Sequence, residues 1–546
     1  MTSLKGIGVS PGFAAGPVYS VAPPPELPPP TAVSDVDSEV ARGRAALADV
    51  SADLERRARA AGDSPAGQIL NAQSMMAADP ALADAVEEEI RGGADAAHAI
   101  DAAIAVHRAA FEAAGGYLAE RVADLDDLRD RAVAVALGRS MPGIPSPGHP
   151  FVLVANDLSP ADTAGLDPRS VVALVTAAGG PTSHTAILAR GLGLPAVVRC
   201  PDILTVVDGM PVTVDGSTGE VRVGVTAEEV AESTARETAR RAALAASSGP
   251  GRTADGHGVQ LLANVGSAKD LAGGLGDGVE GIGLFRTELL YLDRAEEPSF
   301  DEQVEAYRAV FEAMGSRKVV VRTLDAGADK PLPFITPDDE PNPALGVRGI
   351  RIAEKRPAVL RSQLKAIAEA ARTTDADVWV MAPMISTPAE GARFAEECRA
   401  AGIATAGVMI EVPAAALRSA AMLRGVDFLS IGTNDLSQYT FAADRMCGEL
   451  AELLDPWQPA LLELIATCAA AGKAAGRSVG VCGEAASDPG LAVVLTGLGI
   501  SSLSMSPRSV PAVRESLARY TLAECAEIAK AALAAEDAAA ARSVLS

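Results

Sequence analysis

Aromatic side chains are scarce in this sequence of 546 residues, because Phe, Trp and Tyr together make up only 3%. Its cores must therefore be built from Ala, Val, Leu and Ile. Positive charge is also in deficit, with 47 Lys and Arg against 71 Asp and Glu and a formal net charge of −24. A nucleic-acid partner requires a basic face, so this balance argues against one. A small anion can still bind where a few arginines converge.

Paired cysteines and long apolar runs are missing as well. The six cysteines are scattered, and the closest two, Cys468 and Cys482, are 14 positions apart. The sequence has no CxxC spacing, which argues against structural zinc and a disulfide framework and favours a reducing compartment. No run approaches about 20 apolar residues, and the first residues lack the apolar stretch of a signal peptide. We therefore expect a cytoplasmic protein without membrane insertion.

The length predicts two to four domains. Between residues 36 and 139, apolar residues recur three and four positions apart, which predicts a helical domain. Strand-like runs then alternate with short helical patterns and predict an α/β fold. This α/β region is small, so we expect it to recruit Gly6–Tyr19, which makes the helical block an insertion. The strand-like runs are Phe151–Ala155, Ser170–Val175, Ala196–Val198 and Pro211–Val214.

The second half of the chain has a different pattern. Residues Thr226–Ser248 form one charged helical run without a wide apolar face, which is typical of a helix that bridges domains. From Gly256 onward, an apolar strand followed by a helical pattern occurs eight times, which predicts a TIM (β/α)8 barrel within a multidomain α/β protein. The predicted strands are Val259–Val265, Gly281–Phe285, Lys318–Leu324, Val378–Met384, Ala406–Val412, Phe428–Thr433, Val479–Cys482 and Ser502–Met505.

His184 stands in GGPTSHTAILAR, at the start of a helix that Thr182 or Ser183 can cap. The positive end of a helix disfavours imidazolium, so the ring keeps a free lone pair. The same backbone N–H groups stabilise an anion placed on that nitrogen. The position suits a histidine that carries a phosphoryl group. Judged by the residue alone, an ordinary surface or core histidine is the commoner case.

Arg286 and Arg322 lie at the ends of two predicted barrel strands. Arginines there point into the barrel mouth, where they can bind phosphate or carboxylate through two hydrogen bonds. Arg348 and Arg445 can join them around an anionic substrate. For any one of these arginines the alternative is a surface salt bridge.

Carboxylates follow two adjacent predicted strands. Glu411 ends VMIE, and Asn434 and Asp435 follow IGT. Mg²⁺ is typically held by one or two carboxylates together with substrate oxygens and water. The alternative for Asn434 or Asp435 is capping of the next helix.

Cys482 ends another predicted strand, in GVCGE. A thiol with an ordinary pKa of about 8.5 is mostly protonated at neutral pH and can donate a proton. The alternative is a buried, inert thiol.

These motifs together resemble enzyme I of the phosphoenolpyruvate:sugar phosphotransferase system. The resemblance runs from about Lys5 to Lys530 in the family's order. Its segments are GIGVSPGFAAGP, YLAERVADLDDLRDR, GGPTSHTAILAR, GIGLFRTELLYLDR, RTLDAGADKPLP, NPALGVRGIRI, VMIEVPAA, IGTNDLSQYTFAADR and GVCGEAASDP.

The resemblance implies that phosphoenolpyruvate binds in the barrel with Mg²⁺. His184 then accepts the phosphoryl group, passes it to the histidine phosphocarrier protein HPr and so begins sugar uptake, while pyruvate is released. By the same resemblance, Arg286 and Arg322 bind the phosphate, and Asn434 and Arg445 bind other substrate oxygens. Glu411 and Asp435 hold Mg²⁺. Cys482 protonates the enolate carbon.

The family's domain plan gives boundaries for this chain. Residues 1–22 and 150–225 would form the swivelling phosphohistidine domain, 31–145 the inserted HPr-binding domain, 226–250 the linker helix, and 251–546 the barrel through which family members form homodimers. Three positions depart from the pattern. Ala177 and Pro181 stand where the family often has Asp and Arg, which changes the charge around His184, and Ala328 replaces a usual Gly.

One histidine that meets both the substrate and a carrier protein needs a moving domain, so we expect a hinge at the linker helix. Two other functions compete with the enzyme I reading. A pyruvate, phosphate dikinase or phosphoenolpyruvate synthase would need an ATP-grasp domain, and no segment is available for one. A non-catalytic sensor would be expected to lack at least one of His184, Arg286, Glu411 and Cys482, and all four are present.

Overall fold

The chain divides into two compact units, Met1–Ala239 and Arg240–Ser546. Among the described residues, no helix is long and apolar enough to cross a membrane. The computed structural model describes residues 2–21, 25–61, 65–114, 122–139, 141–145, 147–158, 166–180, 183–271, 278–292, 294, 296–327, 332, 334–335, 340, 342–445, 447, 450 and 452–545.

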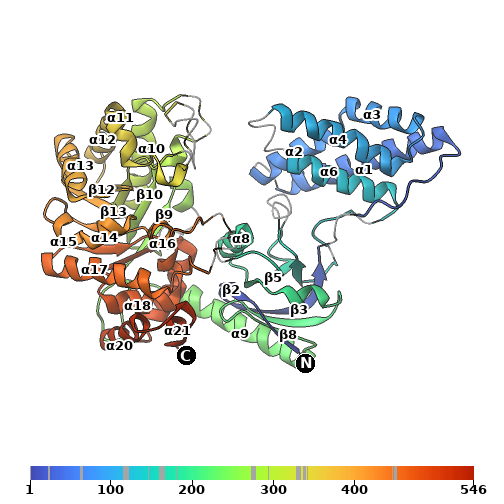
Figure 1. The fold of residues 1–546 in the computed structure, drawn as a ribbon. Helices are drawn as coiled ribbons and strands as arrows, with labels where there is room; N and C mark the ends of the chain where they lie inside the picture. Colours follow the sequence, from blue (N-terminus) through green and yellow to red (C-terminus); the bar gives the residue numbers. More distant parts are fainter. Residues whose placement is uncertain are drawn as a thin grey trace. The chain divides into compact units, whose positions relative to one another are not determined.

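The helical part of the first unit confirms the helical pattern predicted over residues 36–139. Its core contains Leu, Val, Ile and Ala side chains such as Val50, Leu54, Ile90 and Ile100, as the scarcity of aromatics requires. The helices are α1 (Val36–Ala61), α2 (Pro65–Ala77), α3 (Pro80–Arg91), α4 (Ala96–Ala114) and α6 (Val122–Ala136) (Figure 1).

The α/β part of the first unit is one sheet with the strand order β1-β8-β7-β3-β4-β5-β6-β2. The first residues of the chain are recruited as predicted, because β3 pairs with β4 in parallel and β2 pairs with β6. The helices α1 to α6 are therefore inserted between two neighbouring strands. Strand β8 was not expected from the sequence. The strands are β1 (Thr2–Lys5), β2 (Ile7–Ser10), β3 (Phe13–Ser20), β4 (Phe151–Ala155), β5 (Val171–Thr176), β6 (Ala196–Val198), β7 (Pro211–Asp215) and β8 (Glu220–Val223).

The predicted charged helix is confirmed as α9 (Ala227–Ala246). Its first part is attached to the sheet of the first unit. The Phe13 N–H donates to Oε2 of the buried Glu237 at 3.0 Å, and the Arg236 guanidinium lies 3.8 Å from the centre of the Phe13 ring.

The second unit is a closed, fully parallel eight-stranded barrel, and all eight predicted strands are present (Figure 1). The strands are β9 (Gln260–Val265), β10 (Gly281–Arg286), β11 (Lys318–Arg322), β12 (Asp377–Ala382), β13 (Thr405–Ile410), β14 (Leu429–Ile431), β15 (Val479–Val481) and β16 (Ser502–Met505). Helices surround it, chiefly α10 (Phe300–Met314), α12 (Pro357–Arg372), α13 (Pro388–Ala400), α16 (Thr433–Phe441), α17 (Pro459–Ala475), α18 (Pro489–Leu498), α19 (Val510–Leu517) and α20 (Leu522–Leu533).

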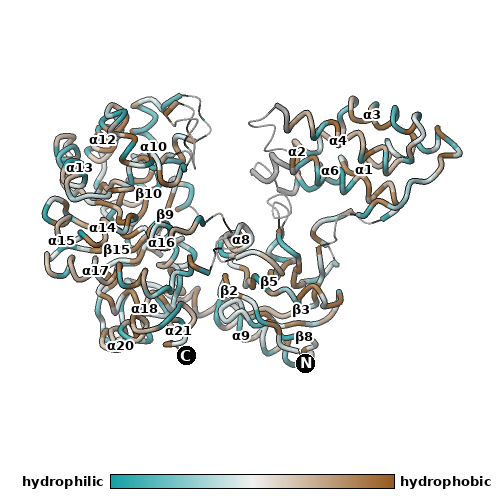
Figure 2. Tube along the Cα trace, in the orientation of Figure 1, coloured by the Kyte–Doolittle hydropathy of each residue, from teal (hydrophilic) through white to brown (hydrophobic). Residues whose placement is uncertain are grey.

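Two apolar layers hold the barrel together. A large core lies between the strands and the surrounding helices, and the strands stand out as hydrophobic segments in Figure 2. A smaller cluster fills the barrel lumen. Its members are Leu284, Val320, Met381, Met409, Phe428 and Cys482, with Trp379 packed against them.

Candidate active site

The predicted site residues of the second unit meet at one end of the barrel. Because all eight strands are parallel, the residues that end or follow them share one mouth. Arg286 and Arg322 end β10 and β11, and the other residues come directly after β13, β14 and β15. These are Glu411, Asn434, Asp435 and Cys482.

Arg322 is buried among carboxylates. Its Nη1 lies 2.9 Å from Asp325 Oδ2 and 4.0 Å from Glu411 Oε1, and its Nη2 forms an ion pair with Glu288. Burial opposes the charged guanidinium, but Asp325 and Glu288 outweigh it and raise the pKa of Arg322 above its ordinary value. The side chain is therefore a fixed positive charge at the mouth, and its Nε makes no hydrogen bond within the described chain.

Arg348 lies deeper, with only 2% of the residue exposed. Its guanidinium donates to Asp325 at 3.2 and 3.3 Å and to Asp435 at 2.9 and 3.2 Å, and to the Tyr439 hydroxyl at 3.4 Å. Burial lowers the pKa of Arg348, and the two carboxylates more than reverse that effect. The structure therefore places Arg348 behind Asp435, and its predicted contact with substrate stays a prediction.

Glu411 is a buried carboxylate at the mouth. It is 1% exposed, and its Oε2 accepts a hydrogen bond from the Met384 N–H at 2.9 Å. Met384 has φ +60°, an uncommon conformation for a residue with a side chain. Burial, and then the charges of Asp435 and Asp325, raise the pKa of Glu411 to about 8. A cation beside Glu411 would relieve this unfavourable negative charge.

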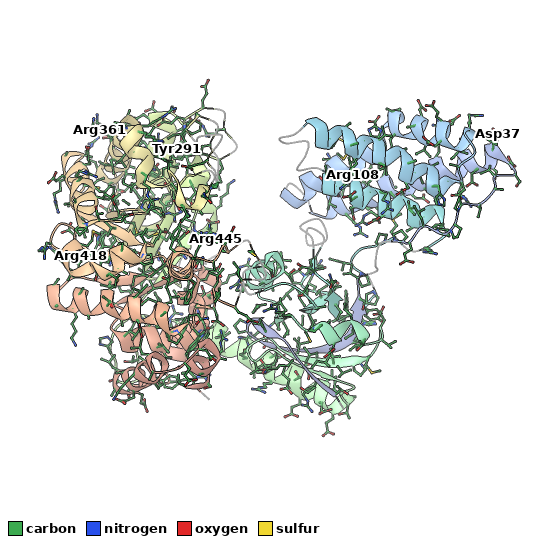
Figure 3. The ribbon with its side chains drawn as sticks, in the orientation of Figure 1. Asp37, Arg108, Tyr291, Arg361, Arg418 and Arg445 are labelled. Carbon is green, nitrogen blue, oxygen red and sulfur yellow. The ribbon has the colours of Figure 1, made fainter. Side chains whose placement is uncertain are left out.

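Asn434 and Asp435 lie in the first turn of α16. Asp435 Oδ2 is 3.7 Å from Arg445 Nη1, so the second predicted carboxylate contacts Arg348 on one side and Arg445 on the other. Arg445, labelled in Figure 3, is half-buried on the segment after α16. Asn434 does not cap α16, whose N-cap residue is Gly432 without a side-chain capping bond. Its Oδ1 instead accepts from the Glu484 N–H after β15 at 2.9 Å.

Cys482 is buried between the mouth and the lumen, with 3% exposed. Its Sγ lies 3.6 Å from the Ile431 carbonyl oxygen, to which it donates. Burial raises the pKa of Cys482 to about 11, although the positive charges of Arg322 and Arg286 act in the opposite direction. The thiol is therefore protonated at neutral pH, the state that a proton donor needs. Arg286 itself is exposed at the end of β10.

Two of these carboxylates fit a magnesium ion by their chemistry. In the described part of the chain, no three His, Cys, Asp or Glu side chains are arranged to hold a metal. Glu411 and Asp435 are nevertheless two buried carboxylates, and the negative charge of Asp435 disfavours ionisation of Glu411. Mg²⁺ typically uses one or two carboxylates and takes its other ligands from substrate and water.

His184 belongs to the first unit, where it is the first residue of α8 (His184–Leu192). Ser183 caps this helix, since its hydroxyl accepts from the Ala186 N–H at 3.3 Å, and Gly193 ends it in the left-handed conformation. The predicted strand–helix position of His184 is therefore confirmed. Ala177 lies in the loop after β5, whereas Pro181, Thr182, Ala328 and the side chain of His184 lie outside the described residues.

Three family models match the chain. They are the N-terminal part of PEP-utilising enzymes over residues 5–121, their mobile domain over 147–219 and their PEP-binding domain over 241–522. A phosphoenolpyruvate-protein phosphotransferase of Streptomyces coelicolor is 53% identical over 99% of this chain and 98% of its own. One of Haloferax volcanii is 40% identical over 98% and 97%. The chain belongs to this phosphotransferase family.

An enzyme I protein solved by NMR is 31% identical to this chain. It covers 44% of this chain and 99% of its own length, with a TM-score of 0.38.

Sequence reasoning missed several residues that shape the mouth of this phosphotransferase family member. Glu288 and Asp325 neutralise Arg322, and Asn264 at the end of β9 donates to the Cys482 carbonyl oxygen at 3.0 Å. Asp325 follows Arg322 by three positions in RTLD, and Glu288 follows Arg286 by two in RTE. Carboxylates that closely follow a strand-end arginine were therefore the available signal.

Proposed function

We propose that this protein takes the phosphoryl group of phosphoenolpyruvate onto His184, releases pyruvate and passes the phosphoryl group to HPr as the first step of sugar uptake. The observation that carries this proposal is the barrel mouth, which brings a buried arginine, two buried carboxylates and a protonated thiol to neighbouring strand ends. Membership of the phosphoenolpyruvate-protein phosphotransferases supports the same chemistry.

Each side chain has a defined task in this proposal. Arg322 and Arg286 bind the phosphate and offset its charge as the P–O bond breaks, and Asn434 and Arg445 hold the other substrate oxygens. When bound, Mg²⁺ neutralises the negative charge of the substrate, and Glu411 and Asp435 would hold it. Arg348 keeps Asp435 in position and stays a candidate substrate ligand. Cys482 protonates the enolate carbon, which makes pyruvate the product.

The domains take matching tasks. Residues 1–22 and 150–225 carry His184 and swivel, 31–145 dock HPr, and 226–250 form the hinge between them and the barrel of 251–546. The barrel also forms the homodimer, and the protein acts in the cytoplasm. The hinge is tested by crosslinking the two units: turnover that stays complete after crosslinking contradicts it.

The decisive experiment incubates the full chain with radiolabelled phosphoenolpyruvate and Mg²⁺ but no nucleotide. We expect an acid-labile, alkali-stable label on the wild type, no label on His184→Ala, and full label on a control, His257→Ala, which changes an exposed histidine. Onward transfer is then tested by adding HPr to the labelled protein. If the label appears only after ATP is added, the result points to the dikinase chemistry. If no label appears with or without ATP, the result points to a sensor.

A further inference from the structure

The strand ends that carry Arg286 and Arg322 are joined by more than their backbone pairing. The pairing of β10 with β11 ends at Arg286 and Arg322, so the two proposed phosphate ligands are direct neighbours. The two residues that follow Arg286 begin a buried 3-10 helix, η3 (Thr287–Leu290). Both of these residues, Thr287 and Glu288, reach across to Arg322.

Thr287 holds the backbone of Arg322, and Glu288 holds its guanidinium. The Thr287 hydroxyl is buried and donates to the Arg322 carbonyl oxygen at 2.8 Å. The Glu288 carboxylate forms its ion pair with Nη2 of the same arginine. The proposed ligand Arg286 is therefore followed directly by two residues that support the other ligand at both of its ends.

Gln363 of α12 fastens Thr287 in turn. Its side chain is fully buried, and its Nε2 donates to the Thr287 hydroxyl at 3.0 Å and to the Tyr307 hydroxyl at 3.2 Å. Its Oε1 accepts from the Leu324 N–H, two residues after Arg322, at 2.9 Å. Both N–H donors and the oxygen of this amide are thus used. One side chain holds the segments that follow both β10 and β11.

The far end of η3 is fixed by α10. Tyr291, labelled in Figure 3, follows η3, and its hydroxyl donates to Gln303 Oε1 at 2.9 Å. Gln303 Nε2 donates to the Pro298 carbonyl oxygen at 3.0 Å, and Tyr307 lies one turn further along α10. Tyr291, Gln303 and Tyr307 are all fully buried, so water cannot replace a hydrogen bond that is lost here.

We propose that Thr287 and Gln363 are positioning residues, which hold Arg286 and Arg322 at the spacing that a phosphate group needs. Both side chains are buried, and they act through the backbone of the arginines rather than on the substrate. Groups that bind a reacting substrate must be held to within about 0.5 Å by the residues that support them. The inference rests on the proposed function and adds to it the residues that set the phosphate site.

Thr287→Val is the sharpest test, because valine has the shape of threonine without its hydroxyl. Binding is measured by calorimetry with Mg²⁺ on the full chain carrying His184→Ala, so that phosphoenolpyruvate binds but its phosphoryl group is not transferred. The second probe is oxalate, a planar dianion that resembles the enolate of pyruvate and has no phosphate. Thr287→Val should weaken phosphoenolpyruvate binding roughly fivefold, the equivalent of one net hydrogen bond, and leave oxalate binding unchanged.

Phosphorylation gives a second measurement, in the chain that keeps His184. Its single-turnover rate should fall roughly 10- to 100-fold in Thr287→Val, since a misplacement of about 1 Å can cost about 10²-fold in rate. Thr287→Ser keeps the hydroxyl and should restore both rate and affinity. Gln363→Met should give the same selective loss of phosphoenolpyruvate binding. The effects of Thr287→Val and Gln363→Met should not add, because the two residues act through one contact.

Thr496→Val is the matched control. Thr496 is another buried threonine of the second unit, on α18, and its hydroxyl makes no hydrogen bond within the described residues. This variant should bind both probes and react as its parent does. Equal losses for the two probes in Thr287→Val, no loss for either, or no rescue by Thr287→Ser overturns the inference. If phosphoenolpyruvate does not bind the His184→Ala chain, or does not label the wild type, the proposed function fails instead.

Discussion

Arg348 and Asp435 are joined by two parallel hydrogen bonds, from Nη1 to Oδ1 at 2.9 Å and from Nη2 to Oδ2 at 3.2 Å. The same guanidinium also binds Asp325, and Asp325 in turn binds Arg322 at 2.9 Å. The proposed phosphate ligand Arg322 and the proposed metal ligand Asp435 are therefore connected through three consecutive buried ion pairs. Their spacing is set by the protein before any substrate arrives, which favours catalysis by preorganisation.

Arg348→Leu should destabilise the barrel unit strongly, because it leaves Asp325 and Asp435 buried without their cation. Removing one partner of a buried pair costs about 3–5 kcal/mol. Urea unfolding followed by tryptophan fluorescence measures this loss in the barrel alone, since the two tryptophans of the chain, Trp379 and Trp457, both lie in the second unit.

The control for this loss is Arg361→Leu, which removes an exposed arginine that lies 3.2 Å from Glu397. Exposed pairs contribute about 0–1 kcal/mol, so this variant should unfold near the wild-type midpoint. Equal losses in the two variants would contradict the role assigned to Arg348.

Ser183→Ala should weaken the helix that begins at His184. Loss of an N-cap hydroxyl costs about 0.5–2 kcal/mol, and here the loss falls on the first turn of α8. Hydrogen exchange of the α8 amides should accelerate severalfold, and Ser183→Asn, which keeps a capping oxygen, should exchange as the wild type does. Unchanged exchange in Ser183→Ala would mean that the cap does not stabilise the turn carrying the nucleophile.

Cys482 should resist alkylation in the native protein. With a pKa of about 11, only about one thiol in a thousand is ionised at pH 8, and the thiolate is the reactive form. Iodoacetamide followed by peptide mass spectrometry should label the partly exposed Cys447 first and Cys482 only as the pH approaches 11 or urea unfolds the barrel. Early labelling of Cys482 at pH 8 contradicts a protonated donor.

The sequence was sufficient to predict the elements that follow from hydrophobic periodicity. Each barrel strand combines a short apolar run with a following helical pattern, and the parallel order then brings Arg286, Arg322 and Cys482 to one mouth. The helix start at His184 was predicted in the same way, from Ser183 next to a strand. Local signals and one topological rule were enough for these features.

The partners of the charged residues could not be predicted in this way. The sequence indicates that Arg348 belongs to an anion site, but only the folded backbone shows that Asp325 and Asp435 take its donors. Such pairs join residues tens of positions apart, and no local pattern records them.

Glu411 should make the barrel less stable as the pH rises, because its pKa is raised in the folded protein from 4.5 to about 8. The contribution of Glu411 to the free energy of unfolding is complete below pH 4.5, where its carboxyl is protonated in both the folded and the unfolded state. It is lost as the pH rises toward 8, because the unfolded chain ionises freely and the folded one does not. Relative to Glu411→Gln, the wild-type free energy of unfolding should fall between pH 5 and 8 by at most about 1.4 kcal/mol per pH unit.

Mg²⁺ should reverse this trend, since a cation bound by Glu411 and Asp435 stabilises the ionised carboxylates and binds only the folded state. The measurement is the urea midpoint by tryptophan fluorescence at pH 8, with and without Mg²⁺, for the wild type and Glu411→Gln. We expect a clear rise for the wild type and a much smaller one for the variant. An equal rise of the urea midpoint in the wild type and in Glu411→Gln would place the ion elsewhere. If the free energies of unfolding of the two proteins change in parallel with pH, Glu411 ionises normally in the folded barrel.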